Sequence, residues 1–180
     1  RLDAEALRDS LLSVSGVLEP RPGGIPDTVS VNQDGLVTVV PTPSGGWRRS
    51  VYLQYRRTEI PTMLATFDYP EMGPNCLTRS VSTVSPQSLL LMNNGHVREL
   101  AAQFANRVIE LADEQLGEPI ATWNQELRRV DTVYALAFTR KPTAEERQLG
   151  IEALQQFEAA WSGNSIAALA GFLHNNKEFG

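Results

Sequence analysis

Apolar residues recur at helical spacing along most of this chain, and their pattern predicts a series of helices. The first covers residues 3–15, where Asp3 is placed to cap the start and Gly16 to end the helix. The most regular apolar stripe runs over residues 97–111 and has charged residues on its opposite face. The same reasoning predicts further helices over residues 61–67, 85–93, 121–139, 143–161 and 165–174.

Three local signals set the ends of the later helices. Ser85 followed by Pro86 is a helix start, with a hydroxyl cap and a proline in the first turn. Thr143 and Glu146 have the spacing of a capping box, in which each side chain binds the backbone N–H of the other residue. The Gly-Asn pair at 163–164 predicts a break, which divides the last helical stretch into two helices.

Two shorter runs, at residues 36–40 and 49–55, are rich in Val, Tyr and Leu and predict β-strands. The segment between them, PTPSGGW, contains turn-forming residues and favours an antiparallel hairpin over residues 36–57. The preceding residues 19–34 are rich in Pro, Gly and Asp and predict a surface loop. Together these elements predict a mainly α fold, a helical bundle of about five to six helices with a small antiparallel β-hairpin.

The chain has 180 residues, which is long enough for one hydrophobic core. We expect residues 1–180 to be a single domain and a fragment of a larger protein, because the chain starts with Arg and not with Met. Within it we expect, in chain order, a first helix at 1–16, the hairpin at 36–57, a short helix, a loop and a helix over 61–94, and a helical part over 96–180.

Charge and composition exclude some classes of partner. The net charge is −5, and residues 110–180 hold eleven acidic and six basic side chains. This acidic half repels a polyanion, so we expect no nucleic-acid partner. No apolar run reaches the roughly 20 residues of a membrane span, and we expect no such span. The single cysteine rules out a disulfide within the chain.

The block at residues 48–94 carries the residue choices that amphipathic helices explain least. Arginines stand near both ends of the predicted strand at 49–57, on both of its faces. Either their guanidinium groups bind an anionic ligand such as a sugar acid, or they form ion pairs within the fold with Glu59, Asp68 and Glu71. The candidate ligand-binding residues are Arg48, Arg49, Tyr52, Arg56, Arg57, Cys76, Arg79 and Trp47.

The cysteine and the histidines do not form a recognisable catalytic set. Cys76 lies three residues before Arg79, whose charge would activate a nearby thiol, but a buried structural thiol explains the same sequence. A cysteine nucleophile also needs a base, and neither His96 nor His174 is predicted beside it. Both histidines fit surface or capping roles. We therefore predict no catalytic residue, no metal site and no cofactor in this fragment.

Five segments, spread in order over nearly the whole chain, resemble one family. They are RLDAEALRDSLLSVSG at 1–16, RRSVYLQYRR at 48–57, FDYPEMGPNCLTRSVSTVSPQSLLLMNN at 67–94, VYALAFTRKPTAEE at 133–146 and FLHNNKEF at 172–179. The family is the domain of unknown function at the C-terminal end of large planctomycete proteins that often also carry a cytochrome-c-like domain. The resemblance implies that this chain is the C-terminal part of that domain. It also implies an exported parent protein, and hence an extracytoplasmic (periplasmic or secreted) location.

Three functions remain open at this point. The first is a non-catalytic interaction or scaffold domain, whose partners are the remaining domains of the parent protein. The second is the binding or processing of an anionic carbohydrate, in which the arginines bind its charge and Tyr52 or Trp47 stacks on a ring. The third is docking of a cytochrome-type electron-transfer domain by the acidic residues 110–180. Because no complete catalytic set is found, we favour the first and a non-enzymatic role for this fragment.

Overall fold

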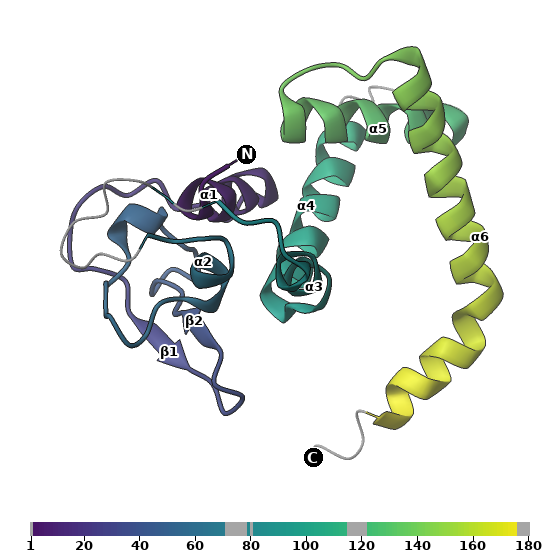
Figure 1. Cartoon of the computed structure of the whole chain (residues 1–180). Coiled ribbons are helices and arrows are strands. Elements are labelled where there is room, and N and C mark those ends of the chain that lie inside the picture. The colour runs from purple at the N-terminus through teal and green to yellow at the C-terminus, as the bar shows by residue number, and fades with distance from the viewer. Residues whose placement is uncertain (1, 71–78, 80, 115–121, 176–180) are drawn as a thin grey trace. The chain divides into compact units, whose positions relative to one another are not determined.

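A computed structural model describes residues 2–70, 79, 81–114 and 122–175 (Figure 1). These residues form six α-helices, one short 3-10 helix and a two-stranded antiparallel sheet. The predicted mainly α class with a small hairpin is therefore confirmed. The helices are α1 (Ala4–Ser15), α2 (Thr62–Thr66), α3 (Ser85–Asn93), α4 (Gly95–Glu114), α5 (Thr122–Phe138) and α6 (Ala144–Asn175).

The chain divides into two compact units, residues 1–107 and residues 108–180, and the division falls within α4. In the first unit α1 packs against α2 and against the 3-10 helix η1 (Ser50–Tyr52), while α2 also contacts α3. The apolar core of this unit contains the buried side chains of Leu12 and Leu64. Arg48, which is as fully buried as Leu12, lies in the same unit.

The hairpin is formed by residues 29–39 and not by the predicted residues 36–57. Strand β2 (Val37–Val39) pairs with β1 (Val29–Val31), so that Val29 is opposite Val39 and Val31 opposite Val37. A backbone hydrogen bond of 2.8 Å from the N–H of Asn32 to the carbonyl of Leu36 closes the short turn that joins the two strands. Gly35 in that turn has a φ of 76°, a conformation that glycine adopts without strain. The short turn favours this pairing over the longer, proline-containing connection that we predicted.

Residues 49–55 are consequently not the second hairpin strand. They form the 3-10 helix η1, followed by a single bridge between Leu53 and Asp27. The backbone N–H of Ser50 donates a hydrogen bond to the carboxylate of Asp9, at 2.7 Å, and is therefore not available to a strand partner. The prediction of a hairpin over residues 36–57 is wrong for this reason.

Helix ends follow the predicted signals in two cases. Gly16 ends α1 in the left-handed conformation, with a φ of 84°, and its N–H reaches the carbonyl of Ser13 at 3.2 Å. The capping box is also present, because Glu146 N–H donates to Thr143 Oγ1 at 3.2 Å and Thr143 N–H to Glu146 Oε2 at 2.8 Å. Both signals act within a few residues, which makes them readable from sequence.

Three other predictions about helix ends are corrected. The residue before α3 is Val84, which has no capping side chain, and Ser85 and Pro86 are already helical. Asp3 makes no capping hydrogen bond to α1. The break at 163–164 is absent, because α6 runs unbroken from Ala144 to Asn175. A glycine inside a helix costs only about 1 kcal/mol relative to alanine and does not by itself end the helix.

In the second unit α5 packs against α6 through a close backbone approach. A Cβ atom added to Gly150 of α6 would lie 2.9 Å from a methyl carbon of Val130, which is buried on α5. Arg147 and Asp131 join the same two helices by two hydrogen bonds of 2.8 and 3.0 Å. None of the helices in the described part of the chain has the length and apolar character needed to cross a membrane.

Candidate functional site

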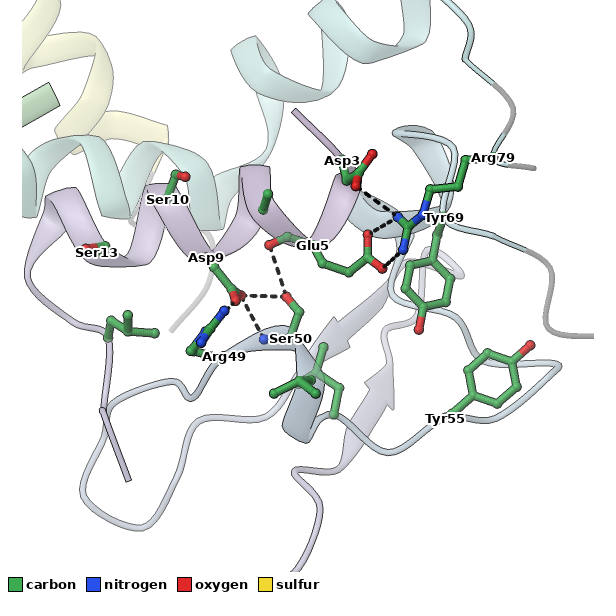
Figure 2. Close-up of a pocket in the computed structure, with 14 residues that line it drawn as sticks. Asp3, Glu5, Asp9, Ser10, Ser13, Arg49, Ser50, Tyr55, Tyr69 and Arg79 are labelled. Atoms are coloured by element: carbon green, nitrogen blue, oxygen red, sulfur yellow. Dashed lines mark hydrogen bonds and ion pairs between the residues drawn. The ribbon is translucent and has the colours of Figure 1, made fainter. Parts of the chain in front are cut away.

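A groove along α1 brings together side chains from separate parts of the first unit (Figure 2). One wall is α1, and the other is formed by residues 49–55. Tyr69 and Arg79 lie at the end nearest the start of α1. The groove has a volume of about 720 Å³. Its lining consists of Asp3, Glu5, Ala6, Asp9, Ser10, Ser13, Leu18, Arg49, Ser50, Val51, Leu53, Tyr55, Tyr69 and Arg79.

The backbone near the groove is held by the buried guanidinium group of Arg48. Its Nε and Nη2 donate hydrogen bonds to the carboxylate of Asp27, at 2.9 and 2.7 Å, and its other donors reach the carbonyls of Gly23 and Ile25. The ring of Tyr52 lies 4.9 Å from the guanidinium carbon. The hydrogen bonds to Asp27 raise the pKa of Arg48, so the group stays charged. Arg48 therefore fixes the loop at residues 23–27 against η1.

A second buried arginine, Arg8, comes from α1 and was not predicted as a functional residue. Its Nη1 donates to the carbonyl of Arg48 at 3.0 Å and to Ser50 Oγ at 3.2 Å. It also lies 3.6 Å from Asp9. Burial lowers the pKa of Arg8 to about 10, although Asp9 and Asp27 oppose this shift. Arg8 therefore ties α1 to the backbone that Arg48 organises.

Asp9 connects the two walls of the groove. It accepts hydrogen bonds of 2.7 Å from both the N–H and the Oγ of Ser50. It also accepts one of 3.3 Å from Nε of Arg49. The carboxylate is thus engaged by the opposite wall, which fixes the width of the groove at this point.

A bidentate ion pair stands at the end of the groove. Arg79 donates to both carboxylate oxygens of Glu5, at 2.8 and 2.9 Å, and lies 3.6 Å from Asp3. The hydrogen bond from Arg79 lowers the pKa of Glu5, so this group stays ionised. The rings of Tyr55 and Tyr69 lie nearby, with centroids 6.3 Å apart (Figure 2). Burial is the main cause that raises the pKa of Tyr69.

The structure brings together only some of the predicted ligand-binding residues. Arg49 and Arg79 line the groove, whereas Arg48 and Tyr52 contact each other and do not line it. Arg48 is also the least accessible of them, with a fully buried side chain. Cys76 lies outside the described residues.

The remaining predicted residues lie outside the groove lining. Arg56 forms an ion pair of 2.7 Å with Glu59, as the alternative of internal pairing predicts. Arg57 is exposed and has no hydrogen-bond or ion-pair partner among the described residues. Trp47 is half-buried, and its ring packs on that of His96, with centroids 4.6 Å apart. This contact covers part of the ring that we predicted to be open for stacking.

Sequence reasoning missed Arg8 and the acidic partners of three arginines, which are Asp27 for Arg48, Asp9 for Arg49 and Glu5 for Arg79. Asp68, one predicted partner, accepts hydrogen bonds of 2.7 Å from Ser82 N–H and Oγ. The other predicted acid, Glu71, lies outside the described residues. One signal for Arg8 was present, because it lies four residues from both Ala4 and Leu12 on the buried face of α1. A charged residue on an apolar helical stripe indicates a buried polar contact.

His96 is half-buried against Trp47 and faces charges of both signs. Burial is the main cause that lowers its pKa, and the positive charge of Arg8 adds to this effect. The carboxylate of Glu99, 3.7 Å away, acts in the opposite direction. The neutral imidazole is therefore the form that the folded chain favours.

We expect the first unit to lose stability as the pH falls below about 6.5, the ordinary pKa of histidine. In this range the unfolded chain takes up a proton at His96, while the lowered pKa keeps the folded side chain neutral. Protonation thus favours unfolding. The pKa of Glu5 is also lowered, but protonation of this group reduces the stability of the fold only at a pH below 4.5, its ordinary pKa.

Thermal unfolding measured at several pH values between about 7.5 and 5 checks this expectation. The variant His96→Phe retains a ring beside Trp47 and should lower the pH dependence in this range. If the variant and the original chain lose the same stability over this range, the shift at His96 is not its cause.

The described residues contain no group of three or more His, Cys, Asp or Glu side chains arranged to hold a metal ion. The described residues form a polar groove whose walls are joined by ion pairs between arginines and carboxylates. The described part of the chain is thus a mainly α domain with an arginine-braced groove.

The model of the PSD1 family, described as proteins of unknown function (DUF1553), matches residues 1–154, and the chain belongs to this family. Comparisons with curated proteins and with solved structures give no match. The resemblance to a domain of unknown function is therefore confirmed, while the planctomycete and cytochrome associations stay predictions.

Proposed function

We propose that this chain is a non-catalytic interaction or scaffold domain, and that the other domains of an exported parent protein are its partners. The extracytoplasmic location is part of the proposal and rests on the family resemblance. The arginines that first suggested a ligand site are mostly engaged within the fold. The pairs are Arg48 with Asp27, Arg49 with Asp9, Arg56 with Glu59 and Arg79 with Glu5.

The observation that carries the proposal is the amount of large apolar surface left exposed. Met92 on α3 has an exposed fraction of 73%, and Leu89, one turn earlier on the same face, is also exposed. On α6 the side chain of Phe157 is likewise 73% exposed, and Leu149, two turns earlier, is exposed as well. Apolar side chains that gather on one helix face and remain uncovered are typical of interaction surfaces. We define these four residues as the apolar faces of α3 and α6.

Binding of an anionic carbohydrate by the arginines has less support. A carboxylate or sulfate ligand would have to displace Asp9 from Arg49, or Glu5 from Arg79. The freed carboxylates would then lie close to the ligand and repel it. Ordinary fold-stabilising pairs explain the same arginines without a ligand.

Hydrogen–deuterium exchange on the isolated chain and on the full-length parent protein tests the proposal. We expect the backbone amides of α3 and α6 to exchange more slowly in the parent, because other domains cover the apolar faces. Equal exchange in both proteins would contradict the proposal.

A matched pair of variants in the parent protein makes the test specific. Phe157→Asp places a charge in the apolar face of α6 and should abolish the extra protection of that helix. Gln156→Asp introduces the same charge at the neighbouring exposed position and should leave the protection in place.

A further inference from the structure

The groove along α1 is not part of the surface proposed to dock other domains, and its size suits a small ligand. The α1 wall extends over residues 3–13, which corresponds to about 15 Å at a rise of 1.5 Å per residue. The volume of about 720 Å³ lies within the range of small-molecule sites. The groove is therefore large enough for an extended ligand of two or three ring units.

The charges in the groove argue against an anionic ligand. Its lining holds three carboxylates, Asp3, Glu5 and Asp9, and two guanidinium groups, those of Arg49 and Arg79. Both arginines already have a carboxylate at hydrogen-bonding distance, 3.3 Å for Arg49 and 2.8 Å for Arg79. Neither guanidinium charge is available to neutralise an anionic ligand at no cost, so an anionic ligand gains little.

The other lining groups suit a ligand that is rich in hydroxyl groups. Ser10 and Ser13 lie on the exposed side of α1, and their side chains make no hydrogen bond within the described residues (Figure 2). The carboxylates of the ion pairs still have lone pairs to which hydroxyl groups can donate. Tyr55, which is 41% exposed, offers both a ring face and a hydroxyl group, and the ring of Tyr69 lies beside it.

From this combination we propose that the groove between α1 and residues 49–55 binds an uncharged carbohydrate. Hydroxyl groups of the sugar bind Ser10, Ser13 and the Glu5–Arg79 pair, while a C–H face of one ring packs on Tyr55. The lowered pKa of Glu5 keeps that group ionised, so it accepts hydrogen bonds from the sugar and does not donate a proton to it.

Isothermal titration calorimetry on the full chain tests this proposal with defined probes. The neutral probes are cellotriose, xylotriose, mannotriose and maltotriose, the charged probe is trigalacturonate, and the peptide probe is tetra-alanine. We expect at least one neutral trisaccharide to bind with a dissociation constant in the millimolar range or lower. It should bind more tightly than trigalacturonate or tetra-alanine. No binding of any neutral trisaccharide, or tighter binding of the charged probe or of the peptide, would overturn the proposal.

Variants assign the binding to the groove. Tyr55→Ala removes the exposed ring and should weaken the neutral sugar about five- to tenfold. Phe138→Ala removes an exposed ring outside the groove lining and should leave the affinity unchanged. Ser10→Ala combined with Ser13→Ala alters exposed positions that carry no internal hydrogen bond, and it should also weaken binding. If all these variants still bind the sugar with unchanged affinity, the binding site lies outside the groove. The hydrogen-exchange experiment on the parent protein tests the proposed function separately and does not depend on the sugar measurements.

Discussion

Replacement of Arg48 by methionine is expected to lower the midpoint of the first thermal unfolding transition by about 10–20 °C. The substitution leaves Asp27 without its charged partner and leaves the carbonyls of Gly23 and Ile25 without their donors. Loss of one partner from a buried ion pair is among the most destabilising single changes in a protein. Because the side chain of Asp27 is itself only 9% exposed, water cannot readily replace the guanidinium group.

Two further variants separate burial from charge. Arg57→Met removes the same charge from an exposed position with no partner among the described residues, and it should shift the midpoint by no more than a few degrees. Arg48→Lys keeps the charge, but a single ammonium group cannot serve Asp27 and both carbonyls, so an intermediate loss is expected. Circular dichroism during heating gives the three midpoints. Equal midpoints for Arg48→Met and Arg57→Met would show that the buried network does not hold the first unit together.

Most of the helical framework could be predicted because its signals are local. The capping box of Thr143 and Glu146 joins residues three apart, and Gly16 ends α1 through bonds to residues in the last turn. The hairpin was misplaced because β1 lies within residues 19–34, which the sequence predicts to be a surface loop. Only the geometry of the turn at residues 32–36 selects β1 as the partner of β2.

The groove could not be predicted because its contacts join residues that are distant in sequence. Arg48 and Asp27 are 21 positions apart, and Arg79 and Glu5 are 74 positions apart. The arginines stood out in the sequence, but any of several acids could have been their partner. Nothing in the sequence shows which carboxylate is brought near by folding, so internal pairing and ligand binding could not be separated.

The hydrogen bonds and ion pairs of the arginines also determine the shape of the proposed sugar site. Asp9 holds Ser50 and Arg49 against α1, and Arg8, on the same helix, donates to the backbone carbonyl of Arg48. The walls are therefore fixed before a ligand arrives, which lowers the entropic cost of binding. The paired arginines thus support ligand binding by fixing the groove, even though their charges are already compensated.

In the second unit, replacement of Gly150 by valine is expected to lower the free energy of unfolding by about 2 kcal/mol. A Cβ atom at this position would lie 2.9 and 3.0 Å from the two methyl carbons of Val130, and valine would add two further methyl groups. Val130 cannot turn aside easily, because a β-branched side chain has essentially one favoured rotamer in a helix. The helices must therefore move apart, at the expense of the packing between α5 and α6.

A double-mutant cycle shows whether this contact is the cause. Gly150→Ala alone gains up to about 1 kcal/mol of helix propensity but meets Val130, and we expect a net loss of about 1 kcal/mol. In a Val130→Ala background the clash is gone, so the same Gly150→Ala change should instead stabilise the unit by about 1 kcal/mol. Urea unfolding gives the four stabilities, and hydrogen exchange of the α5 and α6 amides assigns the change to this unit. A Gly150→Ala effect of the same sign and size in both backgrounds would show that these helices do not depend on the approach of Gly150 to Val130.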